Sequence, residues 1–221
     1  MRTLFHHPLC PFSRKVRLFL AEKNLEFSLH LEPVWQKRPE FLDLNPAGKV
    51  PVLVDHGVIV SDSVAICEYL DEAYNNTSLI GETIIERAES RRLSAWIDES
   101  FYDNVIVKIV YEKLFKRYFE KKHPDSAEIR SGVTALHDYL GYITWLIDRR
   151  YWLAGERLSL ADITTAAHLS TLDYLSHIPW EDYPEIKEWY CRLKSRPSFR
   201  PLLLDQMPGV HPPKHYWDLD F

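Results

Sequence analysis

Two patterns of hydrophobic and polar positions divide the chain. In roughly the first third, short apolar runs with a period of two alternate with stretches that have apolar residues every three or four positions. This alternation predicts strands and helices in turn. The predicted strands are residues 2–6, 26–31, 50–54 and 58–61, the last two joined as a β-hairpin. The predicted helices are residues 11–24, 39–45 and 62–74. A strand–helix–strand unit followed by a hairpin and a closing helix is the thioredoxin-like order.

From about residue 82 onward the strand pattern ends and only long amphipathic stretches follow. They are residues 86–122, 126–149, 160–175 and 184–195, and together they predict a helical bundle. The fold class is therefore an α/β thioredoxin-like N-terminal domain plus an all-α C-terminal bundle. The expected limits are residues 1–75 for the first domain, 76–85 for a linker, 86–200 for the helical domain and 201–221 for a C-terminal tail.

The tail differs in composition from both domains. Pro208, Pro212 and Pro213 exclude a regular helix there. Three aromatic residues and a leucine among the last residues argue against a purely solvated segment.

The overall composition excludes several classes of function. The chain has 221 residues, a formal net charge of -5 and a pI near 6.1, so nucleic acid is not an expected partner. No apolar run approaches the roughly 18 residues of a membrane span, and residues 1–8 do not have the pattern of a secretory signal. Three scattered cysteines fit a reducing, cytoplasmic compartment. Since His, Cys and carboxylate residues lack metal-ligand spacing, no metal site is expected.

Cys10 is the first candidate for chemistry, because it follows the first predicted strand and directly precedes the first predicted helix. A thiol at that place lies near the positive end of the helix dipole and near free N–H groups, and both favour the thiolate. Arg14 and Lys15 would add to this effect if they face the thiol, and Ser13 is a possible hydroxyl donor to the sulfur. The expected chemistry is a mixed disulfide with a small thiol, or stabilisation of a bound thiolate. The alternative is a small buried residue at a strand–helix junction.

Two further segments favour a site for an extended, charged ligand. Pro51 begins a predicted strand, and we expect a cis Val50–Pro51 bond that leaves the Val50 backbone for a ligand, rather than an ordinary edge-strand proline. Asp62 and Ser63 open the third predicted helix, where free N–H groups form an anion site. Ser63 would bind a ligand carboxylate and Asp62 a ligand ammonium group. Plain capping of the helix is the alternative.

A basic run lies in the helical half. Residues 111–122 (YEKLFKRYFEKK) contain five basic and two acidic residues. Most runs of this kind are solvated helix faces, and a basic patch that binds a partner is the alternative.

Taken together, four stretches resemble the glutathione S-transferase superfamily over residues 2–200. They are residues 11–17 (PFSRKVR), 45–53 (NPAGKVPVL), 62–66 (DSVAI) and 158–162 (LSLAD). The resemblance implies the two-domain GST fold, a homodimer, and a glutathione site that includes Lys49, Val50 and Pro51. It also implies that Val50 pairs its backbone with the cysteinyl part of glutathione. Ser63 would hold the γ-glutamyl carboxylate and Asp62 the amino group, the latter from either subunit of the dimer.

The position of Cys10 refines this expectation. Cys10 stands where cysteine-type transferases keep their active thiol. The resemblance therefore implies thiol transfer with glutathione as co-substrate, with Cys10 as the catalytic thiol and Ser13 assisting.

A narrower resemblance points to a different function. Residues 1–6 (MRTLFH), 196–202 (RPSFRPL) and 215–221 (HYWDLDF) are similar to alphaproteobacterial division proteins of the FzlA type. That group keeps the transferase fold, binds the tubulin-like filament protein FtsZ, and uses its terminal tail as an interaction peptide. The tail residues that this resemblance assigns to partner binding are Tyr216, Trp217, Asp218, Leu219, Asp220 and Phe221.

The two resemblances leave two hypotheses of different class. One is a glutathione-binding enzyme that acts through Cys10, a residue that departs from the pattern of the FzlA group. The other is a non-catalytic scaffold that binds FtsZ filaments through its helical domain and tail. A tail that packs only on its own domain is a third possibility.

Overall fold

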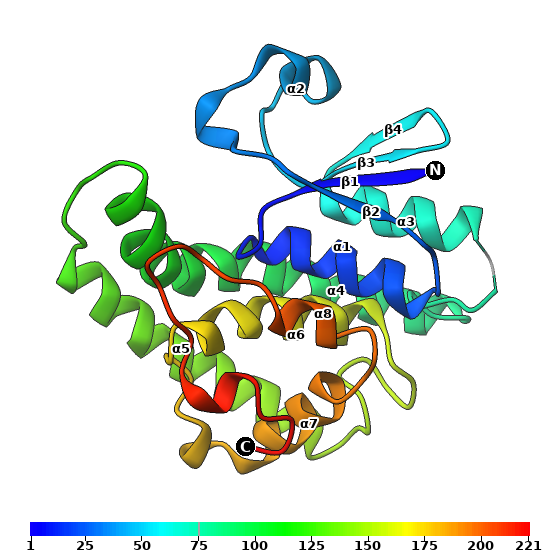
Figure 1. The fold of residues 1–221 in the computed structure, drawn as a ribbon. Coiled ribbons are helices and arrows are strands. Elements are labelled where there is room, and N and C mark those ends of the chain that lie inside the picture. The colour runs from blue at the N-terminus through cyan, green and yellow to red at the C-terminus, as the bar shows by residue number, and fades with distance from the viewer. Residues whose placement is uncertain (75) are drawn as a thin grey trace.

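Four short strands form one mixed sheet with the order β2-β1-β3-β4, in a computed structural model that describes residues 1–74 and 76–221 (Figure 1). The strands are β1 (Arg2–His6), β2 (Ser28–Leu31), β3 (Val52–Asp55) and β4 (Val58–Ser61). β1 runs parallel to β2 and antiparallel to β3, and β3 and β4 form the predicted hairpin. Leu4 of β1 is buried opposite Leu53 of β3. β3 begins after Pro51, because proline has no N–H to donate to a strand ladder.

Two helices cover one face of this sheet. They are α1 (Pro11–Glu22) and α3 (Ser63–Ala73), while η1 (Val34–Gln36) and α2 (Pro39–Leu44) lie on the opposite side (Figure 1). α1 starts with Pro11, whose missing N–H is not needed in a first turn. Asn75, at which the first domain was predicted to end, lies outside the described residues.

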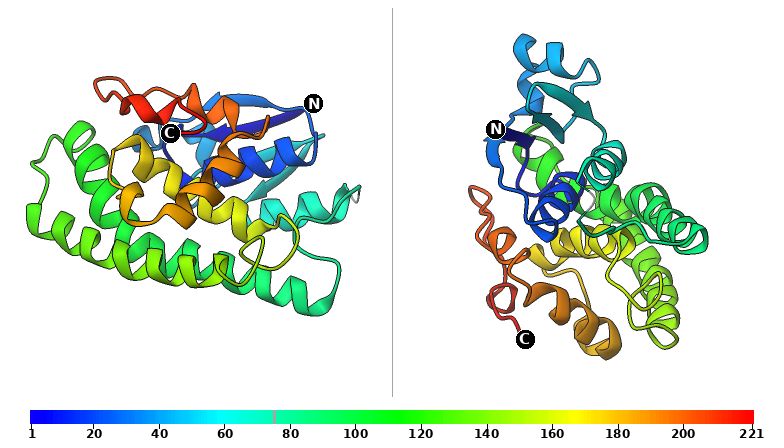
Figure 2. Two further views of the ribbon diagram at one scale, coloured as in Figure 1. Left: turned by 90° about the horizontal axis from the view of Figure 1, so that it is seen from below. Right: turned by 90° about the vertical axis from the view of Figure 1, so that its right-hand side faces the viewer.

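The second half is helical in its described part, apart from isolated bridges. Its main elements are α4 (Ile84–Ala95), η2 (Trp96–Lys116), α5 (Ser126–Ile147), α6 (Leu160–Tyr174) and α7 (Pro184–Lys194). The π-helical segment η2 continues α4 without a break, so the two form one long rod that ends at Lys116, before the predicted limit at residue 122 (Figure 2). α5 approaches this rod closely at Gly132, where a Cβ would come 2.8 Å from the Cβ of Lys108.

α6 is the central helix, and each of its residues is buried. Its start is a capping box: Asp162 accepts from the N–H of Ser159 at 3.0 Å and from its hydroxyl at 2.9 Å. α6 packs on α1, α4 and η2, and it thereby joins the two halves (Figure 2).

The charged side chains of α1 also join the halves. Lys15 is fully buried and donates to Asp98 of η2 at 2.5 Å. Arg14 is fully buried as well and donates to the hydroxyl of Ser170 in α6 at 2.8 Å. These contacts bury two cations with their partners at the domain junction.

The tail folds back on the helical half. It contains α8 (Arg200–Leu203) and the 3-10 turn η4 (Lys214–Tyr216), and the chain ends beside α7 and the 3-10 turn η3 (Trp180–Asp182) (Figure 1). The Tyr216 side chain is fully buried, and the Phe221 ring lies 5.1 Å from that of Trp180. The tail therefore packs on its own chain, whatever else it binds.

Candidate functional site

Cys10 lies at the junction that the sequence predicts, as the N-cap residue of α1 directly after β1. The residue is partly buried, and its sulfur lies 3.9 Å from the carbonyl oxygen of Val50. Ser13 is fully buried one turn further on, where its hydroxyl accepts from the N–H of His7 at 3.3 Å. Ser13 acts on the Cys10 thiol in the direction of a lower pKa.

The protonation of Cys10 differs from the expectation. Burial raises the pKa of its thiol, and this outweighs hydrogen bonds from Ser13 and from the N–H of Phe12 that favour the thiolate. Arg14 does not help as expected, because its guanidinium points to Asp205 and Tyr216 of the tail. Lys15 lowers the pKa only slightly, since its ammonium group is paired with Asp98. The prediction of a favoured thiolate was wrong on this point, because desolvation cannot be read from a motif.

The Val50–Pro51 peptide bond is cis, as predicted. The loop before it is shaped by Asn45, whose side chain donates to the carbonyl of Lys49 at 2.8 Å and accepts from the N–H of Ala47 at 3.2 Å. Among the described residues, no group accepts a hydrogen bond from the N–H of Val50. The Val50 backbone is thus available to a ligand.

Asp62 and Ser63 form the start of α3. The Asp62 carboxylate accepts from the N–H groups of Val64 and Ala65 at 2.8 and 3.2 Å, so it caps the helix. The alternative interpretation, that Asp62 caps the helix, is therefore correct for one oxygen of its carboxylate. Ser63 is buried at the first helical position, where helix N–H groups and the dipole attract an anion.

These segments meet in one pocket of ≈ 570 Å³ between the two halves. The predicted residues that line it are Cys10, Lys49, Val50, Pro51, Asp62 and Ser63. Ser13 does not line the pocket. The tertiary structure brings together segments more than 50 residues apart in the sequence, in the arrangement that their order predicts.

The wall contributed by η2 was not predicted. Its residues in the pocket are Asp98, Glu99, Tyr102, Asp103 and Phe115. Burial raises the pKa of Tyr102 to about 12, so its hydroxyl is a proton donor at neutral pH. The sequence carries no local signal for this wall, because these residues look like the ordinary polar face of a long helix.

The pocket at Cys10 is lined by more acidic than basic side chains. Asp62 and the three carboxylates of η2 line it, whereas Lys49 is its single Lys or Arg among the described residues. Anionic ligand groups therefore depend on helix N–H groups and on Lys49 rather than on a basic cluster.

A smaller pocket of ≈ 150 Å³ adjoins the first and shares Cys10, Tyr102 and Phe115 with it. The remaining wall is largely apolar and includes Ile106 and Val110. The sulfur of Cys10 thus lies between a polar pocket and an apolar one.

The predicted partner-binding residues of the tail separate into two groups. Tyr216 is buried, and the Phe221 ring stacks 4.0 Å from the Lys194 ammonium group. Trp217, Asp218 and Asp220 are exposed. The first group anchors the tail and the second is accessible to a partner.

Metal-binding clusters and membrane-spanning helices are both absent from the described part of the chain. It has no group of three or more His, Cys, Asp or Glu residues placed to hold a metal ion. None of its helices is both long and apolar enough to span a membrane.

The fold and the pocket define a two-domain protein, with a thioredoxin-like half and a helical half that meet around a cysteine at the start of the first helix. The chain belongs to the glutathione S-transferase family. Residues 9–73 match the glutathione S-transferase N-terminal domain, and residues 106–197 match the C-terminal domain.

Individual relatives extend this result over the whole chain. The chain is 46% identical to FtsZ-localized protein A of Caulobacter vibrioides, covering 100% of this chain and 98% of that protein. The crystal structure of a glutathione S-transferase from Rhodospirillum rubrum F11 is 52% identical, with a TM-score of 0.97 over 100% of both chains. A glutathione S-transferase from Methylobacillus flagellatus KT with glutathione bound is 30% identical, with a TM-score of 0.77 over 91% of this chain and 98% of that chain.

Proposed function

We propose that this chain is a division-associated member of the glutathione S-transferase family that binds FtsZ filaments. The observation that carries the proposal is the 46% identity to FtsZ-localized protein A over the whole chain, tail included. The tail geometry supports it, since the buried Tyr216 holds the exposed Trp217 and Asp220 in a defined place. We further propose that the protein acts in the cytoplasm as a homodimer, as its fold family implies.

Co-sedimentation with FtsZ polymers tests this function. We expect wild-type protein to pellet with the polymers, and Trp217→Ala and Asp220→Lys to reduce the pelleted fraction severalfold. Glu156→Lys is the matched control, because it makes the same charge reversal at an exposed residue outside the tail. A wild-type protein that stays in the supernatant would refute the filament role. Tail variants that pellet like wild type would refute the role of the tail alone.

Glutathione binding is a second proposed function, favoured by the convergence of Cys10, Val50 and Ser63 on one pocket. In this proposal the Val50 backbone pairs with the cysteinyl part of glutathione. Ser63 and the start of α3 bind the γ-glutamyl carboxylate, and the second oxygen of Asp62 binds the amino group. Lys49 supplies the positive charge of the pocket, and Pro51 shapes the Val50 backbone. The bound thiol would then lie beside Cys10.

Thiol transfer through Cys10, with Ser13 as hydroxyl donor, is the catalytic form of this proposal. The raised pKa of Cys10 leaves little thiolate at neutral pH. We therefore expect binding to be the stronger property and thiol transfer to be slow.

Calorimetry with glutathione at millimolar concentration tests the binding. We expect Ser63→Ala to weaken it several-fold and Cys10→Ser to leave it within about twofold. Ser131→Ala, on an exposed helix face, is the control. Absence of binding heat in a folded wild-type protein would disprove the glutathione site. Thiol transfer to a small disulfide should be lost in Cys10→Ser, and persistence of that activity would exclude Cys10 as the nucleophile.

A further inference from the structure

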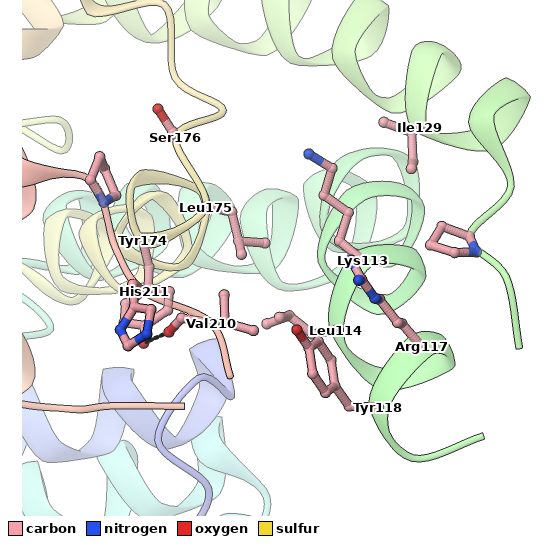
Figure 3. Close-up of a pocket in the computed structure, with 12 residues that line it drawn as sticks. Lys113, Leu114, Arg117, Tyr118, Ile129, Tyr174, Leu175, Ser176, Val210 and His211 are labelled. Carbon is pink, nitrogen blue, oxygen red and sulfur yellow. Dashed lines mark hydrogen bonds between the residues drawn. The ribbon is translucent and has the colours of Figure 1, made fainter. Parts of the chain in front are cut away.

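A second large pocket, of ≈ 450 Å³, lies where the tail meets the helical half (Figure 3). We call it the tail pocket, and it shares no lining residue with the pocket at Cys10. Its lining includes Lys113, Arg117 and Tyr118 from the basic run and Val210, His211 and Pro213 from the tail. The pocket thus joins the basic run of residues 111–122 to the tail.

The charges of the basic run are not equivalent. Lys116 is paired with Glu112 at 2.8 Å, and Lys122 with Glu120 at 2.9 Å. Lys113 and Arg117 both line the tail pocket, and neither forms an ion pair with any residue that the structure describes. They are four positions apart, Lys113 in the last turn of η2 and Arg117 at its C-cap, and so lie on the same face of the chain there.

Acidic groups are missing from the pocket's described lining. Asp125, next to the lining residue Pro124, is turned toward its own helix and accepts from the N–H of Ala127 at 2.8 Å. Burial lowers the pKa of Lys113, which is the effect expected for an ammonium group that is partly desolvated without a counter-ion. An anionic group placed between the two cations would offset this desolvation.

The tail wall of the pocket is held in place by two tyrosines. Tyr118 donates to the carbonyl of Gly209 at 3.0 Å, and Tyr174 donates to that of Val210 at 2.7 Å. The Tyr174 hydroxyl also accepts from the N–H of Met207 at 2.9 Å. The pocket is therefore preformed, and binding does not require the tail to become ordered.

The remaining residues that line the tail pocket are mainly apolar, and they indicate which class of anion would fit there. Ile129, Leu175 and Val210 are partly exposed and contribute aliphatic surface beside the cations. Inorganic phosphate would leave that surface unused, and nucleic acid needs a broader basic surface than two side chains provide. An apolar side chain next to a carboxylate matches both features.

We propose that the tail pocket binds an acidic, apolar peptide segment of a protein partner, with its carboxylate between Lys113 and Arg117 and an apolar side chain against Leu175 and Val210. This site goes beyond the proposed filament and glutathione functions, because it holds for any partner with such a segment. Failure of FtsZ co-sedimentation would leave it intact.

Fluorescence anisotropy with a labelled Glu-Leu-Glu-Leu peptide, a sequence absent from this chain, that has a free carboxyl end tests the proposal. We expect saturable binding to the full-length protein and at least tenfold weaker binding to a Lys113→Gln/Arg117→Gln variant. A neutral Gln-Leu-Gln-Leu amide peptide should bind at least tenfold more weakly than the acidic one. Lys121→Gln, an exposed basic residue of the same run outside the pocket, is the control.

Carbodiimide cross-linking gives an independent readout, since it should join the peptide carboxylate to the ammonium group of Lys113. Absence of both binding and the cross-link at millimolar peptide would overturn the proposal. So would equal binding of the neutral peptide, an equal loss in Lys121→Gln, or displacement of the peptide by low-millimolar phosphate. A change of oligomeric state in the double variant would overturn it in favour of a second copy as the occupant.

Discussion

Arg14 of the first helix donates to the hydroxyl of Tyr216, the last buried tyrosine of the tail, at 3.0 Å. The same guanidinium donates to Asp205 at 3.3 Å, to Ser170 at 2.8 Å and to the carbonyl of Pro8 at 2.7 Å. A fully buried cation is thereby satisfied from both halves of the molecule and from the tail. Arg14, one helical turn after Cys10, thus anchors the C-terminal tail that is proposed to bind a partner.

The Arg14–Tyr216 contact should stabilise the fold measurably. We expect Tyr216→Phe to lower the free energy of unfolding by about 2 kcal/mol, because it removes a buried hydrogen bond to a charged group. Urea denaturation followed by circular dichroism measures this change. Tyr151→Phe, on an exposed ring, should change it by less than about 0.5 kcal/mol. Equal effects of the two variants would mean that the contact adds no stability.

The buried pair Lys15–Asp98 should behave differently from surface pairs. Asp98→Ala leaves a fully buried ammonium group unpaired, and we expect a loss of about 3–5 kcal/mol of unfolding free energy. Adding Lys15→Met to it should recover much of that loss. Glu181→Ala, which breaks the exposed pair with Lys187, should cost less than about 1 kcal/mol. A double variant no more stable than Asp98→Ala would contradict this account.

His168 predicts a loss of stability in mild acid. Burial lowers its pKa to about 4, although Asp98 opposes this shift. The unfolded chain, with a histidine pKa of about 6.5, therefore binds more protons than the folded chain between these two values. Stability is present above pH 6.5 and falls as the pH drops toward 4, by about 2 kcal/mol at pH 5 for this group alone.

The matched variants for this prediction are His168→Gln and His123→Gln. His168→Gln should reduce the pH dependence of the unfolding free energy between pH 7.5 and 5, since glutamine does not titrate, while His6, His7 and His177, whose pKa values burial also lowers to about 4, keep their share. His123 is exposed, so its replacement should leave the slope unchanged. An unchanged slope in His168→Gln would show that other groups cause the acid sensitivity.

Cys10 should be less reactive than a free thiol at neutral pH. Because burial raises its pKa and Ser13 partly offsets this effect, Ser13→Ala should raise the pKa further and slow alkylation several-fold at pH 7.5. Iodoacetamide labelling of Cys10 as a function of pH, read by mass spectrometry, measures this rate. Ser61→Ala, on another wall of the same pocket, is the control. Alkylation of Cys10 faster than that of free cysteine would show that the helix dipole dominates after all.

Local patterns in the sequence determined much of the fold. The strands, the helices, the cap position of Cys10, the Ser159–Asp162 capping box and the order of the pocket segments follow from periodicity, proline placement and capping residues. Such features depend on neighbours within a few positions, and they survive almost any packing. The same sequence stretches also indicate the family, because the two domains of this family carry such stretches in the same order along the chain.

Other features were decided only by the tertiary structure. The basic residues after Cys10 look free to favour a thiolate, yet Arg14 and Lys15 are drawn to Asp205 and Asp98 by packing of the two halves. The acidic wall of η2, the burial of Tyr216 and the unpaired cations of the tail pocket have the same origin. Each of these features depends on which segments, distant in the sequence, pack against one another and exclude water. Desolvation and charge pairing are set by those contacts, and no local pattern contains them.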